Sequence, residues 1–176
     1  RKDRLKAGQP CAGRTLPVGR RRVGARPMDM VMTQLSEHFT LAEMTASATA
    51  KARGLKNQPN ALQLANLIRL CKFILEPLRV HFGKPVRITS GYRCFTPDSQ
   101  HGRGEAADLE IPGVPNIEVA RFIRDHLPFD QLILEAWSEG EPNAGWVHVG
   151  YRQGGGRKSV LRTPTGKAPY FAGLPA

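Results

Sequence analysis

The sequence predicts an α+β domain in which helices flank a small antiparallel sheet. Two segments, 59–78 and 116–127, repeat apolar residues at three- and four-residue steps, as one buried helix face does. Four short segments read as strands, and the turn-rich residues 138–143 connect the last two of them as in a hairpin. Helices mixed with hairpin-connected strands are typical of the α+β class.

The folded part begins near Leu35, and three helices are expected after it. Residues 40–43 have the form of a capping box, which predicts a short first helix. Pro59 opens a longer helix that Pro77 should kink or end, with a buried stripe of Leu64, Ile68, Cys71, Leu75 and Leu78. Asn116 can cap a third helix, which Pro128 closes and whose apolar face holds Val119, Ala120, Ile123 and Leu127.

The expected strands are short and lie between these helices and after them. Residues 86–89 alternate as a half-buried strand does, and 106–111 form a second strand that Pro112 stops. Residues 130–134 and 146–151 are the two strands of the hairpin. The Gly- and Pro-rich end of the chain can add one more strand at 159–162.

The net charge of +11 is concentrated at the N-terminal end. Residues 1–27 hold nine Lys and Arg against one acid, and they show no apolar periodicity. We therefore expect residues 1–30 to be a disordered basic tail or an extension from upstream coding sequence, and residues 31–176 to form one domain. The domain is only mildly basic, so we expect no nucleic-acid partner; the weaker alternative is DNA binding through residues 1–27.

Cysteine usage argues against a disulfide framework and against a structural zinc site. Cys11, Cys71 and Cys94 are odd in number, widely spaced and in no CxxC pair. Cys71 falls on a helical apolar face and is expected in the core. Cys94 is a weak candidate for a fourth metal ligand or a nucleophile, because no neighbouring residue supports either role.

Two histidines and an aspartate carry the metal-ligand chemistry of the chain. His101 precedes Asp108 by seven residues, and His148 follows on a strand-like run forty residues later. Side chains alternate across a strand, so Asp108 and His148 can face one cleft if their strands are neighbours. Imidazole and carboxylate ligands suit zinc, and three of them leave a fourth position for water, which favours amide hydrolysis. Taken alone, the same three residues are also compatible with a structural role.

The surrounding motifs extend this pattern. Residues 90–93 read SGYR, 99–108 read SQHGRGEAAD, and 146–149 read WVHV. Together they resemble the zinc D-alanyl-D-alanine carboxypeptidase family, which includes bacteriophage endolysin peptidases and shares its fold with the hedgehog signalling domain. The resemblance covers roughly residues 35–152, including 129–133. It implies a hedgehog/D,D-peptidase-like fold and a zinc ion held by His101, Asp108 and His148.

The resemblance also implies substrate-binding residues. Arg93 would bind the substrate carboxylate or carbonyl, a task that suits the two parallel hydrogen bonds of a guanidinium. Ser99, which opens the second motif, and Trp146, beside His148, are expected to bind substrate as well. A strand tryptophan is equally often a core residue, so Trp146 has that alternative. The loop 94–98 is shorter than in many relatives, which affects the expected specificity more than the metal site.

The general base departs from the common family pattern. Many members carry an acid three positions before the final histidine, and this chain has Gly145 there. Glu135, at the end of the strand 130–134, is the candidate that replaces it, because a neighbouring antiparallel strand can bring it to the zinc water. Glu139 and Glu141 lie in a turn and are weaker candidates. The alternative is that Glu135 is an ordinary surface acid.

The sequence as a whole predicts a zinc-dependent peptidase that hydrolyses amide bonds of peptidoglycan stem peptides, either as a D,D-carboxypeptidase or as an endolysin-type endopeptidase. The alternative is a non-catalytic cell-wall-binding or virion structural module that keeps the zinc. No apolar run has the length of a transmembrane helix or the form of a secretory signal. We therefore expect no membrane partner, a monomer, and a protein that is cytoplasmic until released, or phage-associated, and acts on the cell wall.

Overall fold

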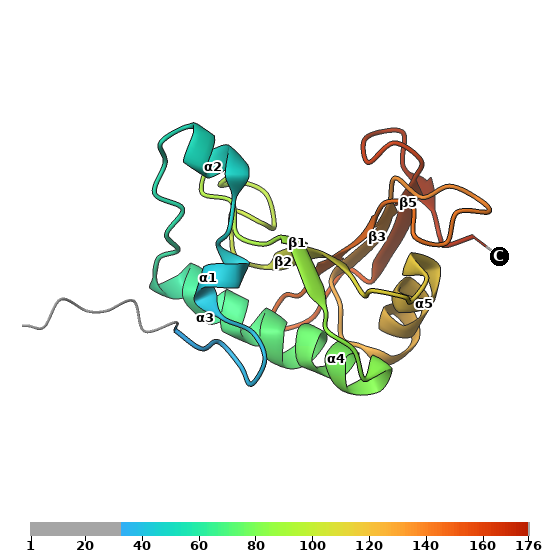
Figure 1. Cartoon of the computed structure of the whole chain (residues 1–176), viewed down its shortest axis with the longest axis horizontal. Helices are drawn as coiled ribbons and strands as arrows, with labels where there is room; N and C mark the ends of the chain where they lie inside the picture. The colour runs from blue at the N-terminus through green and yellow to red at the C-terminus, as the bar shows by residue number, and fades with distance from the viewer. Residues whose placement is uncertain (1–32, 176) are drawn as a thin grey trace, which may run out of the picture. The chain divides into compact units, whose positions relative to one another are not determined.

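A computed structural model describes residues 33–175, and these form helices and one mixed sheet (Figure 1). The predicted tail, 1–30, and Cys11 lie outside the described residues. The helices are α1 (Leu41–Met44), α2 (Ala48–Ala52), α3 (Ala61–Leu70), η1 (Cys71–Leu75), α4 (Glu76–Phe82) and α5 (Asn116–His126). The strands are β1 (Arg87–Ser90), β2 (Ala106–Glu110), β3 (Gln131–Glu135), β4 (Trp146–Gly150), β5 (Ser159–Thr163) and β6 (Phe171–Ala172). The α+β class is confirmed.

The sheet is larger than expected and is not purely antiparallel. Its six strands lie in the order β1-β2-β4-β3-β5-β6. The predicted β3–β4 hairpin is confirmed, with Ile133 opposite His148. The prediction of an antiparallel sheet is wrong at one place, because β5 pairs with β3 in parallel. The further likeness to the hedgehog fold stays a prediction.

The parallel pair follows from which strand edge is still free after β4. One edge of β4 is paired with β3 and the other with β2. β4 ends at Gly150, beside Gln131 at the start of β3, and β5 begins at Ser159, on the other side of the same residue. The chain therefore passes the end of β3 through residues 151–158 and returns along its free edge, in the direction of β3.

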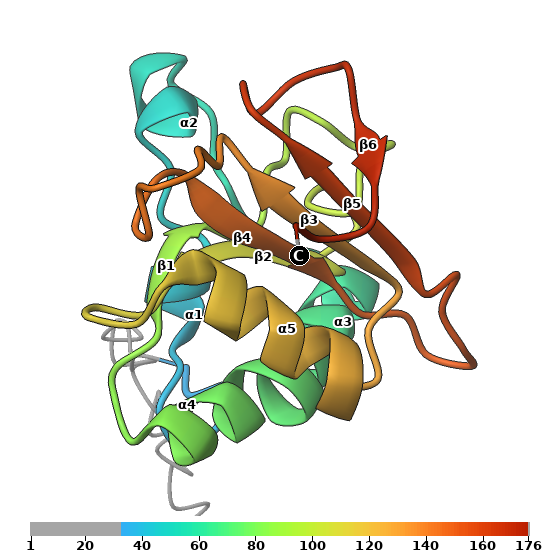
Figure 2. The same cartoon turned by 90° about the vertical axis from the view of Figure 1, so that its right-hand side faces the viewer.

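The two faces of the sheet have different characters. One face is apolar and packs against α3, η1, α4 and α5, which lie together on that side (Figure 2). Its fully buried residues are Ala107, Leu109, Leu132, Leu134, Val147 and Val149. Because side chains alternate along each strand, the residues between these point to the opposite face. That face carries Asp108, His148 and Glu135, so the core fixes the backbone on which the polar residues stand.

The long helix continues through the point at which Pro77 was expected to kink or end it. The chain is helical from α3 through η1 to α4, and η1 has π-helical hydrogen bonding directly before Pro77. Proline has no N–H to donate, and a π-helical turn is one way to accommodate such a residue. The stripe is confirmed at Cys71, Leu75 and Leu78, which are buried, but Ile68 is 40% exposed.

One predicted helix cap is wrong. Asn116 does not cap α5: the N-cap is Pro115, and Asn116 is buried. Its side-chain amide donates to the carbonyl oxygens of Ala144 and Gly145 instead, and so holds the segment that leads into β4. At the first helix, the Thr40 hydroxyl accepts from the Glu43 N–H, as predicted. None of the described helices has the length and hydropathy to span a membrane.

Candidate metal centre

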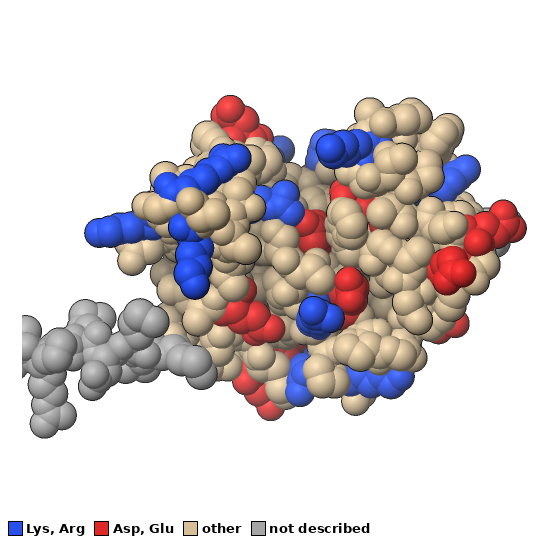
Figure 3. All heavy atoms as spheres, turned by 45° about the horizontal axis from the view of Figure 1, so that its top comes forward, with Lys and Arg blue, Asp and Glu red and all other residues tan. Residues whose placement is uncertain are grey.

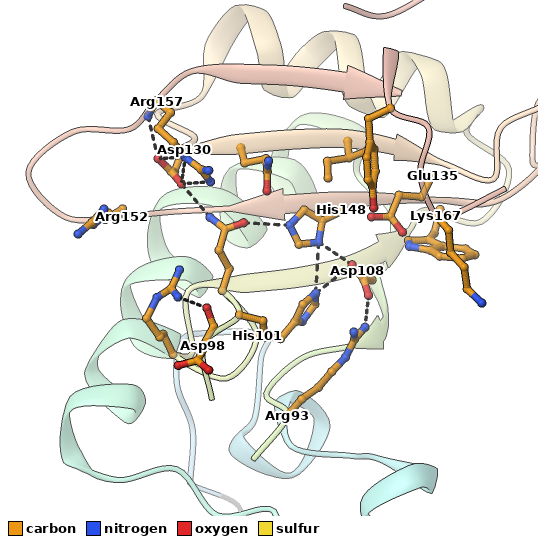
Figure 4. Close-up of a pocket in the computed structure, with 18 of the residues that line it drawn as sticks. Arg93, Asp98, His101, Asp108, Asp130, Glu135, His148, Arg152, Arg157 and Lys167 are labelled. Atoms are coloured by element: carbon orange, nitrogen blue, oxygen red, sulfur yellow. Dashed lines mark hydrogen bonds and ion pairs between the residues drawn. The ribbon is translucent and has the colours of Figure 1, made fainter. Parts of the chain in front are cut away.

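His101, Asp108 and His148 come together as the sequence predicts. Asp108 on β2 is paired directly with His148 on the central strand β4, and His101 reaches them from the loop before β2 (Figure 4). His148 Nδ1 lies 2.9 Å from Asp108 Oδ1, and His101 Nε2 lies 3.2 Å from His148 Nδ1 and 3.3 Å from Asp108 Oδ1. All three residues are buried. Their ligand atoms are therefore close enough to share one ion.

The outer nitrogen of each ring has an acceptor that fixes which nitrogen faces the centre. His101 Nδ1 lies 2.7 Å from the carbonyl oxygen of Gly91, which can only accept, so this nitrogen carries the proton. His148 Nε2 lies 3.1 Å from Gln100 Oε1. Both rings thus donate outward, and their lone pairs at His101 Nε2 and His148 Nδ1 point to Asp108. Outer partners of this kind are typical of metal-ligating histidines.

A second carboxylate determines how Gln100 presents its amide. Gln100 Nε2 donates to Asp130 Oδ2 at 2.8 Å, so Oε1 of the same amide is turned toward His148. Burial alone would raise the pKa of Asp130, but its hydrogen bonds with Arg157 outweigh this and lower the pKa. Asp130 therefore stays ionised and can only accept. No role was expected for Gln100, Asp130 or Arg157, although the first two lie inside the motifs quoted from the sequence.

The donor set fits a zinc ion. Three acceptor atoms at these distances need a positive charge between them, either a proton on one imidazole or a metal ion. Burial by itself would raise the pKa of Asp108, but its contacts with His101 and His148 outweigh this and hold the pKa below its usual range. Two imidazole nitrogens and a carboxylate oxygen, all buried, are the ligands of catalytic zinc sites.

Arg93 lies beside the metal ligands, and part of its role was not expected. Its Nη2 donates to Asp108 Oδ2, the carboxylate oxygen that does not face the histidines. Its Nε donates to Ser90 Oγ at 2.7 Å. Arg93 therefore orients the ligand Asp108, and among the described residues its Nη1 has no partner. That N–H group remains available to a substrate oxygen.

Glu135 lies at the end of β3 on the same face as His148 (Figure 4). Burial raises the pKa of its carboxyl, although His148 and Arg93 lower it in part. The indole N–H of Trp146 lies near this carboxylate but has no partner with full hydrogen-bond geometry among the described residues. A half-buried carboxylate with a raised pKa beside a metal site has the properties of a general base. Glu135 is half-buried and lines the cleft, and its role as the base stays a prediction.

The backbone explains why the acid is not at position 145. Gly145 has a φ of +68°, and a Cβ there would lie 1.8 Å from the carbonyl oxygen of Glu135. Any side chain at 145 would therefore collide with the end of β3. Position 145 therefore carries no carboxylate, whereas Glu135 on β3 lines the cleft.

The three ligands and Glu135 line one cleft of about 750 Å³. In the face that Figure 3 shows, a hollow lined by acidic and basic side chains lies between the side that carries α2 and the side that carries the C-terminal strands. Ser99 and Trp146 also line the cleft. The Ser99 hydroxyl donates within its own loop, to Thr96 O at 2.8 Å, and accepts from the Gly102 N–H. Substrate binding by Ser99 and Trp146 stays a prediction.

The remaining sequence candidates do not line the cleft. Cys94 is half-buried and does not line the cleft. Cys71 is fully buried in the core, as predicted, and burial raises the pKa of its thiol to about 12. Glu139 and Glu141 are exposed and belong to the turn between β3 and β4, outside the cleft. Cleft residues that sequence analysis missed include Arg152, Lys167 and Tyr170, which lie beyond the recognisable motifs.

A buried site for one metal ion beside a free carboxylate is the arrangement of a metallohydrolase. The family model described as Peptidase M15 matches residues 37–149, well over half of the chain. The chain therefore belongs to the M15 family of zinc D-alanyl-D-alanine carboxypeptidases. A comparison with curated proteins found no match.

Proposed function

We propose that this protein is a zinc metallopeptidase that hydrolyses amide bonds in peptidoglycan stem peptides, as a D,D-carboxypeptidase or as an endolysin-type endopeptidase. One observation carries the proposal: three acceptor atoms, His101 Nε2, Asp108 Oδ1 and His148 Nδ1, meet in a cleft that also holds Glu135. Membership of the M15 family supports the same reaction class and a peptidoglycan-type substrate.

His101, Asp108 and His148 would hold the zinc ion, which when bound polarises a carbonyl and lowers the pKa of water at its open position. Glu135 accepts the proton of the attacking water and donates it to the nitrogen of the leaving amine. Its raised pKa makes the carboxylate a stronger base toward the attacking water, and a pKa closer to the working pH lets one group serve first as base and then as acid.

Arg93 acts on the carbonyl side of the scissile bond. Ser90 and Asp108 hold the Nε and Nη2 groups of its guanidinium, so the Nη1 group is presented in a fixed direction. A fixed N–H donor stabilises the negative charge that develops on the carbonyl oxygen, without needing to reorganise during the reaction. The same group can alternatively bind a substrate carboxylate in the ground state.

The proposed partner is the peptide portion of the cell wall, and the proposed place of action is the cell wall, reached after release from the cytoplasm or as part of a phage particle. A monomer suffices for the proposed reaction, because the ligands, Glu135 and Arg93 all come from one chain. The non-catalytic wall-binding module is the competing outcome of the test.

The test is mass spectrometry of muropeptides after purified peptidoglycan is incubated with the zinc-loaded full chain. We expect new fragments whose masses identify the cut amide bond, and we expect a chelator to prevent them. The Asp108→Ala variant should release nothing. If the zinc-loaded chain binds peptidoglycan and leaves every muropeptide intact, it is a wall-binding module and the proposed hydrolysis is wrong.

A further inference from the structure

The wall of the cleft beside Glu135 is built by a segment that lies beyond the family match. The match ends at residue 149, whereas Thr165, Gly166, Lys167 and Tyr170 line the same cleft as the metal ligands. They belong to the connection between β5 and β6. β5 pairs with β3 so that Thr163 stands directly beside Glu135. The strand pairing therefore brings this connection to the general base.

The turn at 163–167 is held in one conformation by its own hydroxyl groups. Thr163 is 1% exposed, and its hydroxyl donates to the carbonyl oxygen of Lys167 and accepts from the Thr165 N–H. The Thr165 hydroxyl donates to the same Lys167 carbonyl at 3.0 Å and accepts from the Lys167 N–H at 3.3 Å. Three of these four hydrogen bonds reach the backbone of Lys167, and the fourth closes the turn before it.

The turn also packs directly on the floor of the cleft. Gly166 has a φ of +68°, and a Cβ there would lie 3.0 Å from Cη2 of Trp146. Trp146 precedes the ligand His148 by two residues and points to the same face of β4. The backbone at Gly166 therefore lies close to the indole ring of Trp146, next to Lys167 in the chain.

Lys167 brings an uncompensated positive charge to this wall. Among the described residues, no carboxylate lies within ion-pair distance of its Nζ, and no acceptor receives a hydrogen bond from it. Arg157 and Arg103, which line the same cleft, are paired with Asp130 and Glu105. In Figure 4, Lys167 lies past Glu135 as seen from His148, and Arg152 lies at the opposite end. The ammonium group is therefore free to meet a ligand at this end of the cleft.

We infer that Lys167, held by the 163–167 turn, forms a subsite that binds a carboxylate of the peptide substrate on the Glu135 side of the metal centre. This inference rests on the proposed function for the identity of the substrate, because stem peptides carry free carboxylates close to their amide bonds. The subsite acts on binding, because the ammonium touches no reacting atom. Lys167 is in this sense a specificity residue of the cleft.

The experiment compares acid and amide forms of one peptide. The probes are L-Ala-γ-D-Glu-L-Lys-D-Ala-D-Ala, its C-terminal carboxamide, and the analogue with isoglutamine in place of glutamate. Dissociation constants are measured by calorimetry on the zinc-loaded full chain carrying Glu135→Gln, in which turnover is slow enough for binding to be measured. The same peptides are then used for KM and kcat with Glu135 intact.

We expect the acid to bind tighter than one of the two amides by about three- to tenfold, as for one partly exposed ion pair. Lys167→Met should abolish this preference and raise KM for the acid by a similar factor with little change in kcat, and Lys167→Arg should retain it. Lys72→Met is the matched control, at an exposed lysine of η1 on the other face of the sheet, and should behave as the unmodified chain.

Two outcomes overturn the inference: no preference for the acid over either amide, or a preference that Lys167→Met leaves intact. Failure of the proposed function is seen separately. If the zinc-loaded chain with Glu135 intact cuts none of the peptides but shows a Lys167-dependent preference in binding, the subsite is supported and the peptidase proposal is wrong. If it cuts them with a KM that Lys167→Met does not change, the peptidase is supported and the subsite is wrong.

Discussion

Gln100 Oε1 lies 3.1 Å from Nε2 of His148, and this contact determines which nitrogen of His148 can bind a metal. Because the Gln100 amide also donates to the ionised Asp130, its oxygen cannot turn away without losing that bond. His148 must then present Nδ1 to Asp108. The metal site is therefore prepared by residues that do not touch the metal.

Replacing Gln100 with Leu should weaken zinc binding by about 10- to 100-fold, the usual effect of removing an outer partner of a metal-ligating histidine. Without the acceptor at Oε1, His148 is free to change tautomer and orientation. Zinc affinity is measured by competition with a chromophoric chelator. Gln131→Leu is the matched control, since Gln131 lines the same cleft on β3 and its side chain makes no hydrogen bond among the described residues. Equal affinities in the two variants would contradict this role of Gln100.

Glu135→Gln should leave the zinc content near one ion per chain and lower kcat by about 10²- to 10⁴-fold, because the amide cannot accept the proton of the attacking water. Metal content is measured by elemental analysis and turnover by release of new amines from peptidoglycan. Glu139→Gln and Glu141→Gln change equivalent charges in the exposed turn outside the cleft and should retain full turnover. Retention of turnover in Glu135→Gln would remove Glu135 from the role of base.

The substitution Glu135→Gln should also stabilise the metal-free protein at neutral pH. Burial raises the pKa of Glu135 in the folded state above the ordinary 4.5, so ionisation of this carboxyl at pH 7 opposes folding. The neutral amide avoids this cost, and its advantage should disappear as the pH falls below the ordinary value, where the carboxyl is protonated in both states. Thermal unfolding with chelator present, at pH 7 and near pH 4, measures the difference. An advantage that is the same at both pH values would show that ionisation of Glu135 is not its cause.

Gly145→Ala should be far more destabilising than Gly140→Ala. Both glycines have positive φ, which costs a side chain about 1–2 kcal/mol, but nothing lies within 4 Å of a Cβ at Gly140, whereas a Cβ at Gly145 meets the carbonyl oxygen of Glu135. The collision should add about 1–3 kcal/mol to the cost at 145. Denaturant unfolding of the two variants gives the comparison. Equal losses of unfolding free energy in the two variants would mean that the backbone at the end of β3 can shift to make room, and that position 145 could accommodate an acid.

The cluster of His101, Asp108 and His148 could be predicted from the sequence, because the chemistry of metal ligands limits the residue types. Only a few side chains ligate zinc, and His101, Asp108 and His148 stand in motifs with recognisable neighbours such as Arg93 and Trp146. Strand alternation then requires Asp108 and His148 to share a face once β2 and β4 are paired.

The residues that surround the three ligands could not be predicted from the sequence, because the pairing of the strands brings them together. Arg157 reaches Asp130 from a loop after β4, and Lys167 reaches the cleft only because β5 returns beside β3. The parallel direction of β5 depends on which strand edges remain free, and a single segment such as 159–162 carries no sign of that. The predicted capping role of Asn116 was wrong for a similar reason, because its side-chain amide donates a hydrogen bond to a residue before β4 instead.

The central claim is that hydrolysis depends on one zinc ion held by His101, Asp108 and His148. It is tested most directly by removing all metal from the full chain with a chelator and titrating zinc back while muropeptide hydrolysis is measured. Activity should be absent without metal and should rise linearly to its maximum at one equivalent, with no recovery in His148→Ala. Full activity in the metal-free chain, or equal recovery in His148→Ala, would contradict the claim.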